Sequence, residues 1–277
     1  MRYSIITIKG GFGNQLFQYC LANSLKSLGV KVKLNIDFYD KNRFDFNNNT
    51  YRDLIFEPNF FQLKEKNLFD DIILKIRNIG HRFNLNLFQF FKGYEFQHSN
   101  LKTVNIFDGY WQNKEILIEN KNFLINELSK IELIKNNLEN TSNLERTMIH
   151  VRRNDYLGME EELNSNFYEK SLDYLNKNIN KLSYDVFTDD EEWVKNNTTF
   201  SEAENIYGEK YLENNPIKIF SKMLLYNNFI VGNSTFSLLA AFLKESSSST
   251  IIVADPWFRK IQHPGFLFDN WISIKNT

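Results

Sequence analysis

The first 36 residues carry the pattern that most constrains the fold of this chain. Residues 3–8 are rich in β-branched side chains and predict a strand, and the glycines within residues 10–13 predict a turn. Apolar residues recur at helical spacing over residues 14–28, Gly29 ends that helix, and residues 30–36 predict a second strand. A strand, a glycine turn, a helix and a strand in this order are typical of a parallel α/β layer.

The same alternation returns in the second half of the chain. Strands are predicted at residues 147–149, 183–187, 229–231 and 251–254, and helices at 168–180, 191–195, 216–227 and 238–244. Residues 68–79 and most of residues 114–138 are also predicted to be helical. We therefore expect two Rossmann-like lobes, residues 1–138 and 139–255, facing across a crevice, with residues 256–277 packing back on the first lobe.

Composition narrows the class of protein. Hydrophobic residues make up 42% and charged residues 24% of the 277 residues, which indicates a folded globular chain. With 33 Lys and Arg against 34 Asp and Glu, no broadly basic face for nucleic acid is expected. The single cysteine, Cys20, excludes an internal disulfide and a multi-cysteine metal site. Neither a signal peptide nor a membrane-spanning run is evident, so we expect a cytoplasmic protein.

A cluster of charged side chains follows the strand at residues 147–149 and comprises His150, Arg152, Arg153 and Asp155. Alternation places His150 and Arg152 on one side of the strand and Arg153 on the other. Arginine presents a planar fork of donors that matches phosphate oxygens and never loses its charge. We expect one arginine to meet an anion such as a diphosphate while Asp155 holds the other; a surface salt-bridge cluster is the alternative.

Three further polar segments also lie at predicted strand-to-helix turns. The turn at Gly11, Phe12 and Asn14 leads into a helix N-terminus, where free N–H groups favour an anion. Asp189 and Asp190 follow the strand at 183–187 and are expected to pair with a base or a ribose, to bind a metal, or to cap a helix. A second phosphate cradle or an ordinary capped helix is expected at Asn233, Ser234, Thr235 and Phe236. The carboxyl ends of strands are where open α/β sheets bind ligands.

These segments together match the ordered motifs of a known family. The stretches are GGFGNQLFQY at 10–19, GYWQ at 109–112, HVRRNDY at 150–156, FTDDEEW at 187–193 and NSTFSLLAA at 233–241. In this order, over nearly the whole chain, they resemble the bacterial α-1,2-fucosyltransferases of glycosyltransferase family 11. The family's usual glycine after the two arginines is Asn154 here.

The resemblance implies a GT-B-type fold and inverting transfer of L-fucose from GDP-β-L-fucose to the 2-hydroxyl of a terminal galactose. It assigns the first lobe to the acceptor and the second to GDP-fucose. The donor-binding residues it implies are His150, Arg152, Arg153, Asp189, Asp190, Asn233, Ser234, Thr235, Phe236, Gly11, Phe12 and Asn14. Gln15, Tyr110 and Trp111 are expected on the acceptor side, and no metal or other cofactor is implied.

In the expected reaction Arg152 meets the charge on the β-phosphate, Arg153 pairs with Asp155, and Asp189 or Asp190 reads guanine. The general base is Glu160, Asp155 or none, and residues 160–162 are alternatively a solvated acidic face. A transferase for another GDP-sugar and a non-catalytic nucleotide- or sugar-binding module remain the rival functions. The family further implies surface-glycan assembly such as O-antigen biosynthesis, with peripheral contact at the inner face of the plasma membrane through a lipid-linked acceptor.

Overall fold

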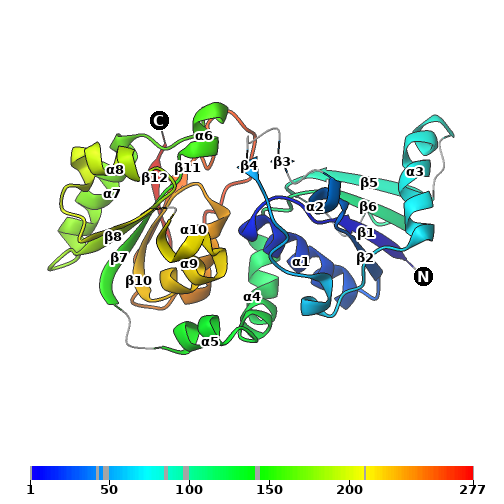
Figure 1. Ribbon diagram of the computed structural model, residues 1–277, viewed down its shortest axis with the longest axis horizontal. Coiled ribbons are helices and arrows are strands. Elements are labelled where there is room, and N and C mark those ends of the chain that lie inside the picture. Colours follow the sequence, from blue (N-terminus) through cyan, green and yellow to red (C-terminus); the bar gives the residue numbers. More distant parts are fainter. Residues whose placement is uncertain are drawn as a thin grey trace. The chain divides into compact units, whose positions relative to one another are not determined.

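Parallel sheets organise the protein, as seen in a computed structural model that describes residues 2–41, 44–45, 50–83, 87–95, 100–140, 144–208 and 210–276. The chain divides into two compact units, Met1–Glu127 and Leu128–Thr277, coloured blue to green and green to red in Figure 1. Among the described residues, no helix has the length and apolar character needed to cross a membrane.

The first unit is built on a parallel sheet of strand order β2-β1-β6-β5. Its strands are β1 (Tyr3–Thr7), β2 (Lys31–Asn35), β5 (Phe88–Gly93) and β6 (Val104–Gly109). A short antiparallel pair, β3 (Phe44–Asp45) and β4 (Thr50–Tyr51), lies outside this sheet. The helices are α1 (Phe12–Ser27), α2 (Asp37–Lys41), α3 (Leu68–Phe83) and α4 (Lys114–Leu128). The predicted opening of strand, turn, helix and strand is confirmed.

The second unit contains a six-stranded parallel sheet of order β12-β11-β10-β7-β8-β9. Its strands are β7 (Leu144–Val151), β8 (Tyr184–Thr188), β9 (Asn205–Tyr207), β10 (Tyr226–Val231), β11 (Ile251–Asp255) and β12 (Ile272–Lys275). Its helices are α5 (Glu132–Glu139), α6 (Asn154–Met159), α7 (Ser165–Asn178), α8 (Glu191–Asn196), α9 (Pro216–Met223) and α10 (Thr235–Lys244). Buried apolar residues of β7, β8, β10, β11 and α7 form one continuous core.

The boundary between the units differs from the expected residue 138. Helix α5 belongs to the second unit because it packs on α9, where the Asn137 amide donates to the Ser221 carbonyl at 2.8 Å. Residues 256–276, expected to pack on the first lobe, are fixed in the second unit by the pairing of β12 with β11. The predicted helix at 216–227 also ends early, because Tyr226 already begins β10.

Candidate functional site

The strand order of the second unit marks a place for a ligand. The chain runs outward from β7 through β8 to β9, then returns to add β10 on the other side of β7. At such a reversal the loops leave in opposite directions and open a crevice at the carboxyl ends of the strands. Arg152 follows β7, and Asn233 and Ser234 follow β10. Two predicted motifs therefore lie at the same switch point.

Arg152 is held between two carboxylates. Its Nε lies 2.8 Å from Asp155 Oδ1, and its Nη1 lies 2.9 Å from Asp189 Oδ2. The side chains of Asp155 and Asp189 are nearly buried, whereas that of Arg152 keeps 22% of its surface exposed. Since the guanidinium has five N–H donors, this double ion pair fixes the fork and leaves donors for an exposed anion.

Arg153 has different partners from those expected. The predicted pairing of Arg153 with Asp155 is wrong, because α6 begins directly after Arg153 and turns Asp155 toward Arg152. Arg153 Nε instead donates to Asp190 Oδ2 at 3.1 Å, and its guanidinium lies over the Trp193 ring at 3.9 Å. Asp190 Oδ1 also accepts from the Trp193 amide, so the predicted N-cap of α8 is confirmed.

Asp189 connects the ends of β7 and β8. Its Oδ1 accepts the Arg153 amide at 2.7 Å, and its carbonyl accepts the Asn154 side-chain amide at 2.6 Å. Burial raises the pKa of Asp189 against the opposing effect of Arg152. Burial alone would lower the pKa of Arg152, but Asp189 and Asp155 raise it above the ordinary value, so the arginine stays charged. Asn154, the departure from the family pattern, thus adds a bond to the arginine–aspartate cluster of residues 152, 153, 155, 189 and 190.

His150 is a neutral member of the site. Burial, reinforced by the charge of Arg152, lowers its pKa to about 3. Its Nδ1 lies 2.9 Å from Ser237 Oγ on α10, and the Phe236 ring lies 6.3 Å away between ring centroids. At neutral pH the imidazole can therefore bind a ligand by hydrogen bonding without adding a positive charge.

The turn between β10 and α10 approaches β7 closely. A Cβ placed on Gly232 would lie 2.7 Å from the His150 carbonyl oxygen, so only glycine fits without a backbone shift. Ser234 caps α10 by accepting from the Phe236 amide, and Thr235 is the first residue of the helix. The Tyr156 hydroxyl donates to the Asn233 carbonyl at 2.8 Å, which ties this turn to α6.

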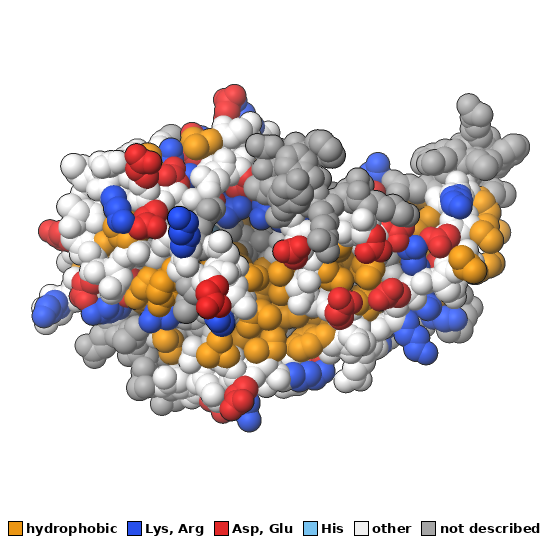
Figure 2. All heavy atoms as spheres, in the orientation of Figure 1, with side chains coloured by type: hydrophobic (Ala, Val, Ile, Leu, Met, Phe, Trp, Pro, Cys, Tyr) orange, Lys and Arg blue, Asp and Glu red, His pale blue; other side chains and the backbone are white. Residues whose placement is uncertain are grey.

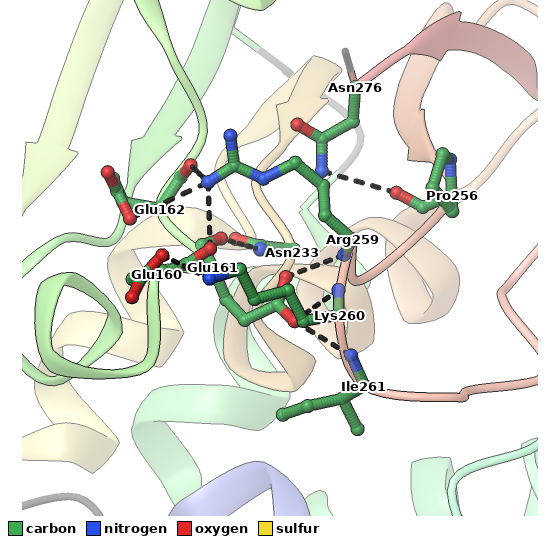
Figure 3. Close-up of polar contacts among 9 residues, drawn as sticks. All are labelled: Glu160, Glu161, Glu162, Asn233, Pro256, Arg259, Lys260, Ile261 and Asn276. Carbon is green, nitrogen blue, oxygen red and sulfur yellow. Dashed lines mark hydrogen bonds and ion pairs between the residues drawn. The ribbon is translucent and has the colours of Figure 1, made fainter.

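The three glutamates at 160–162 have three different roles (Figure 3). Glu160 is exposed and pairs with Lys260, which lowers its pKa. Glu161 is fully buried, and its carboxylate accepts the amides of Arg259, Lys260 and Ile261 at 2.6, 2.8 and 2.9 Å. The Asn233 side-chain amide donates to the Glu161 carbonyl at 2.6 Å. Glu162 pairs with Arg259 at 3.6 Å. The alternative of a simple solvated face is therefore wrong for Glu161.

In the first unit, the motifs at residues 10–19 and 109–112 lie where the strand order reverses, between β1 and β6. Gly11 precedes α1 without a side-chain cap, Phe12 packs on Phe56, and the Gln112 amide donates to Asn14. Tyr110 is half-buried, and the centroid of its ring lies 5.2 Å from Lys9 Nζ.

Two residues expected on the acceptor side serve the interior of the first unit. Gln15 and Trp111 are both fully buried. The Gln15 amide donates to the Asp53 carbonyl at 2.8 Å and its oxygen accepts the Ile55 amide at 2.9 Å, and Trp111 packs edge-on to Phe107. Neither side chain presents a surface to a ligand.

Comparison with known proteins identifies the family of the chain. The family model described as glycosyl transferase family 11 matches residues 4–275. The chain belongs to glycosyl transferase family 11. It is therefore a glycosyltransferase, and the GT-B-type α/β architecture expected from the sequence is confirmed.

Two Escherichia coli glycosyltransferases resemble the chain over nearly their full lengths. An α-1,2-colitosyltransferase is 26% identical, with 99% of this chain and all of that protein covered. The O-antigen biosynthesis glycosyltransferase WbnK is also 26% identical, with coverage of 96% and 99%. A mutant of Arabidopsis thaliana FUT1, solved in complex with GDP, shares the fold at a TM-score of 0.50 and 12% identity, covering 91% of this chain and 70% of that one.

Sequence reasoning missed the residues that support the site from a distance. Ser237, Gly232 and Glu161 contact site residues that lie 72 to 87 positions away along the chain. Ser237 lies within the motif at 233–241 and Gly232 directly precedes it, but no sequence signal pointed to Glu161.

Proposed function

We propose that this glycosyltransferase moves L-fucose from GDP-β-L-fucose to the 2-hydroxyl of a terminal galactose, with inversion to an α-1,2 linkage. The observation that carries the proposal is Arg152, a charged guanidinium fixed by Asp155 and Asp189 at the switch point of the second sheet. The α-1,2 linkage is supported by the colitosyltransferase relative, and a role in O-antigen biosynthesis by WbnK.

In the proposed step the bond between the sugar C1 and the β-phosphate oxygen breaks early, through an oxocarbenium-like transition state. The bonding electrons pass to the diphosphate, and the exposed donors of Arg152 stabilise that charge. His150 and residues 233–236 bind the donor nearby. Guanine recognition by Asp189 or Asp190 stays a prediction, and either carboxylate would have to share its protein partners with the base.

The base candidates differ in their surroundings. Glu160 is exposed and its pKa is lowered by Lys260, which makes it a weak proton acceptor. Asp155 is buried against Arg152. We therefore favour a strongly dissociative transfer in which the acceptor oxygen bonds to the sugar C1 and its proton passes late to the departing diphosphate or to solvent, with little help from either carboxylate.

Because a fixed arginine serves the leaving group, we propose that the reaction needs no divalent metal. Activity measured in EDTA should match that in added Mg²⁺ or Mn²⁺. A loss of turnover in the chelator that added metal restores would contradict this proposal.

A second donor has a specific observation in its favour. The relative named as an α-1,2-colitosyltransferase makes GDP-colitose the main rival of GDP-fucose. The deciding experiment measures GDP release from GDP-fucose, GDP-colitose and GDP-mannose with a panel of galactosides, and assigns the product linkage by NMR. We expect turnover with GDP-fucose and a 2-linked product. Preference for GDP-colitose would replace the donor, and absence of GDP release from every pair would favour the non-catalytic binding module.

The site of action is also proposed. We place the enzyme in the cytoplasm, where nucleotide sugars are substrates and Cys20 would stay reduced. There it would extend a lipid-linked glycan at the inner face of the plasma membrane.

A further inference from the structure

Helix α3 presents an apolar face away from the core of its own unit. Leu68, Phe69 and Ile72 keep 83%, 66% and 53% of their surface exposed. Figure 2 shows hydrophobic side chains gathered over this helix at the right edge of the molecule, beside basic ones. Soluble proteins rarely leave large adjoining apolar side chains in water without a partner.

The exposure does not come from a poorly anchored helix. On the opposite face, Ile73 and Leu74 pack with Ile5 and Ile106 in the core of the first unit. Asp70 is fully buried on this same face and accepts a hydrogen bond from the Tyr3 hydroxyl. With its inner face occupied in this way, α3 cannot rotate to bury Leu68 and Ile72.

The first turn is also held by its own cap. Asn67 Oδ1 accepts the amides of Phe69 and Asp70 at 3.0 and 3.2 Å, and Asp70 Oδ2 accepts the Asn67 amide at 2.8 Å. These reciprocal bonds form a capping box, which fixes the direction of the residues within the turn. The outward apolar side chains are thus a built feature of the fold.

The spacing of the apolar residues in α3 and the charges beside them indicate what kind of partner this face can bind. Leu68, Ile72 and Ile76 follow one another at intervals of four, and the sequence continues with Ile79 three residues later and Phe83 four residues after that, which is helical spacing. Residues 72–83 include three basic residues, at positions 75, 77 and 82, and neither Asp nor Glu. The two acidic residues of the first turn are engaged: Asp70 is buried and Asp71 pairs with Lys66 at 2.5 Å.

We propose that α3 docks the protein on a membrane surface that carries anionic lipids. An apolar stripe flanked by basic residues is the pattern of a helix that lies in the plane of the interface, with its apolar side chains among the acyl chains and its cations near phosphates. This contact is made by the protein itself. It is independent of the proposed sugar transfer and of any lipid-linked acceptor.

The experiment mixes the full-length protein with vesicles of phosphatidylcholine alone or with added phosphatidylglycerol, and measures co-sedimentation at low and high salt. No glycolipid is present, so binding through an acceptor is excluded. We expect binding to the anionic vesicles that weakens with salt. The triple variant Leu68→Gln, Phe69→Gln and Ile72→Gln should bind at least about tenfold more weakly, because its apolar insertion is lost.

Matched variants separate this result from a general loss of surface hydrophobicity. Ile118→Gln in α4 and Leu133→Gln in α5 also replace exposed apolar residues, at 57% and 45% exposure, and should bind like the wild type. Lys75→Gln should reduce binding only to the anionic vesicles. Circular dichroism checks that each variant is folded, which is expected because the replaced side chains are in solvent.

Three results would overturn the proposal. In the first, the wild-type protein co-sediments with neither kind of vesicle. In the second, the triple variant binds as well as the wild type. In the third, the apolar face of α3 binds a second copy of the chain. In the last case, light scattering would show a dimer that the triple variant abolishes, without vesicle binding. A protein that binds vesicles but shows no GDP release would leave the docking intact and contradict the proposed function alone.

Discussion

Arg152 combines a fixed position with a permanent charge, and these two properties set its role at the residue scale. Two buried carboxylates orient it and leave part of its side chain exposed. Arg153, one position later, is committed to Asp190 and the Trp193 ring. Neighbouring arginines with the same chemistry therefore have different roles, because only Arg152 pairs with both Asp155 of α6 and Asp189 after β8.

Replacing Arg152 should affect catalysis more than fold. Loss of one preorganised donor to a developing oxyanion costs roughly 2.7–4 kcal/mol of barrier, so Arg152→Ala should lower kcat by about a hundredfold or more. The change also leaves Asp155 and Asp189 without their cation, so Arg152→Lys is the companion variant that keeps the charge and loses the fork. Steady-state kinetics on folded protein measures both. Near-normal turnover in either variant would remove Arg152 from the leaving-group role.

At the scale of elements, Glu161 joins segments that are far apart in sequence. Its carboxylate binds the amides of residues 259–261 after β11, and its carbonyl binds Asn233 before α10. A carboxylate that accepts several amides is the efficient way to hold a loop that lacks regular structure of its own.

Glu161→Gln should destabilise the protein by about 2 kcal/mol, because a buried amide hydrogen loses its acceptor and meets another donor. Glu160→Gln is the matched control at the adjacent, exposed position, and it should unfold like the wild type. Urea denaturation of the two variants measures the difference. Equal midpoints would show that the three bonds contribute nothing net to stability.

The close packing of the turn after β10 against β7 predicts that a substitution of Gly232 affects both stability and donor binding. The added methyl group of Gly232→Ala would press on the His150 carbonyl and move β10 away from β7. We expect a lower melting temperature together with weaker donor binding, since His150 and Asn233 flank the same turn. Isothermal titration with GDP tests the second part. Unchanged affinity in a destabilised variant would separate the turn from the donor site.

At the scale of the whole molecule, the buried His150 and the half-buried His263 make stability depend on pH. Burial lowers the pKa of His150 to about 3 and that of His263 to about 4, from an ordinary value of 6.5. The unfolded chain binds protons first as pH falls below 6.5, so the free energy of unfolding should decline there, by up to about 1.4 kcal/mol per pH unit for each group. Above that range both states are neutral at these sites, and the two groups add no dependence.

Urea denaturation from about pH 7 to 5 measures the decline. His263→Gln should flatten part of the slope, because Gln does not titrate. A wild-type free energy of unfolding that stays constant over this range would contradict the lowered pKa of both rings.

Local pattern by itself determined much of this protein. Strand and helix periodicity, the glycine turns and the polar residues at strand ends are properties of short segments, and they predicted β1 and β2 of the first sheet, β7, β8, β10 and β11 of the second, and the position of the motifs. Among the described elements, strands β3, β4, β5, β6, β9 and β12 and helices α2 and α6 were not predicted, because short elements carry little periodicity and their pairing depends on neighbours that lie far away in the sequence.

The tertiary structure decided the partners. Arg152 and Asp189 are 37 positions apart, and Glu161 lies 98 positions from Arg259, so their contacts depend on how the strands order themselves in the sheet. The expected reaction pairs Asp155 with Arg153, yet the first turn of α6 places Asp155 against Arg152. Periodicity likewise predicted the helix at residues 68–79, and only the packing of Asp70 and Ile73 showed that Leu68 and Ile72 of α3 face water. Sequence patterns report which side chains share a face, whereas the fold decides what that face meets.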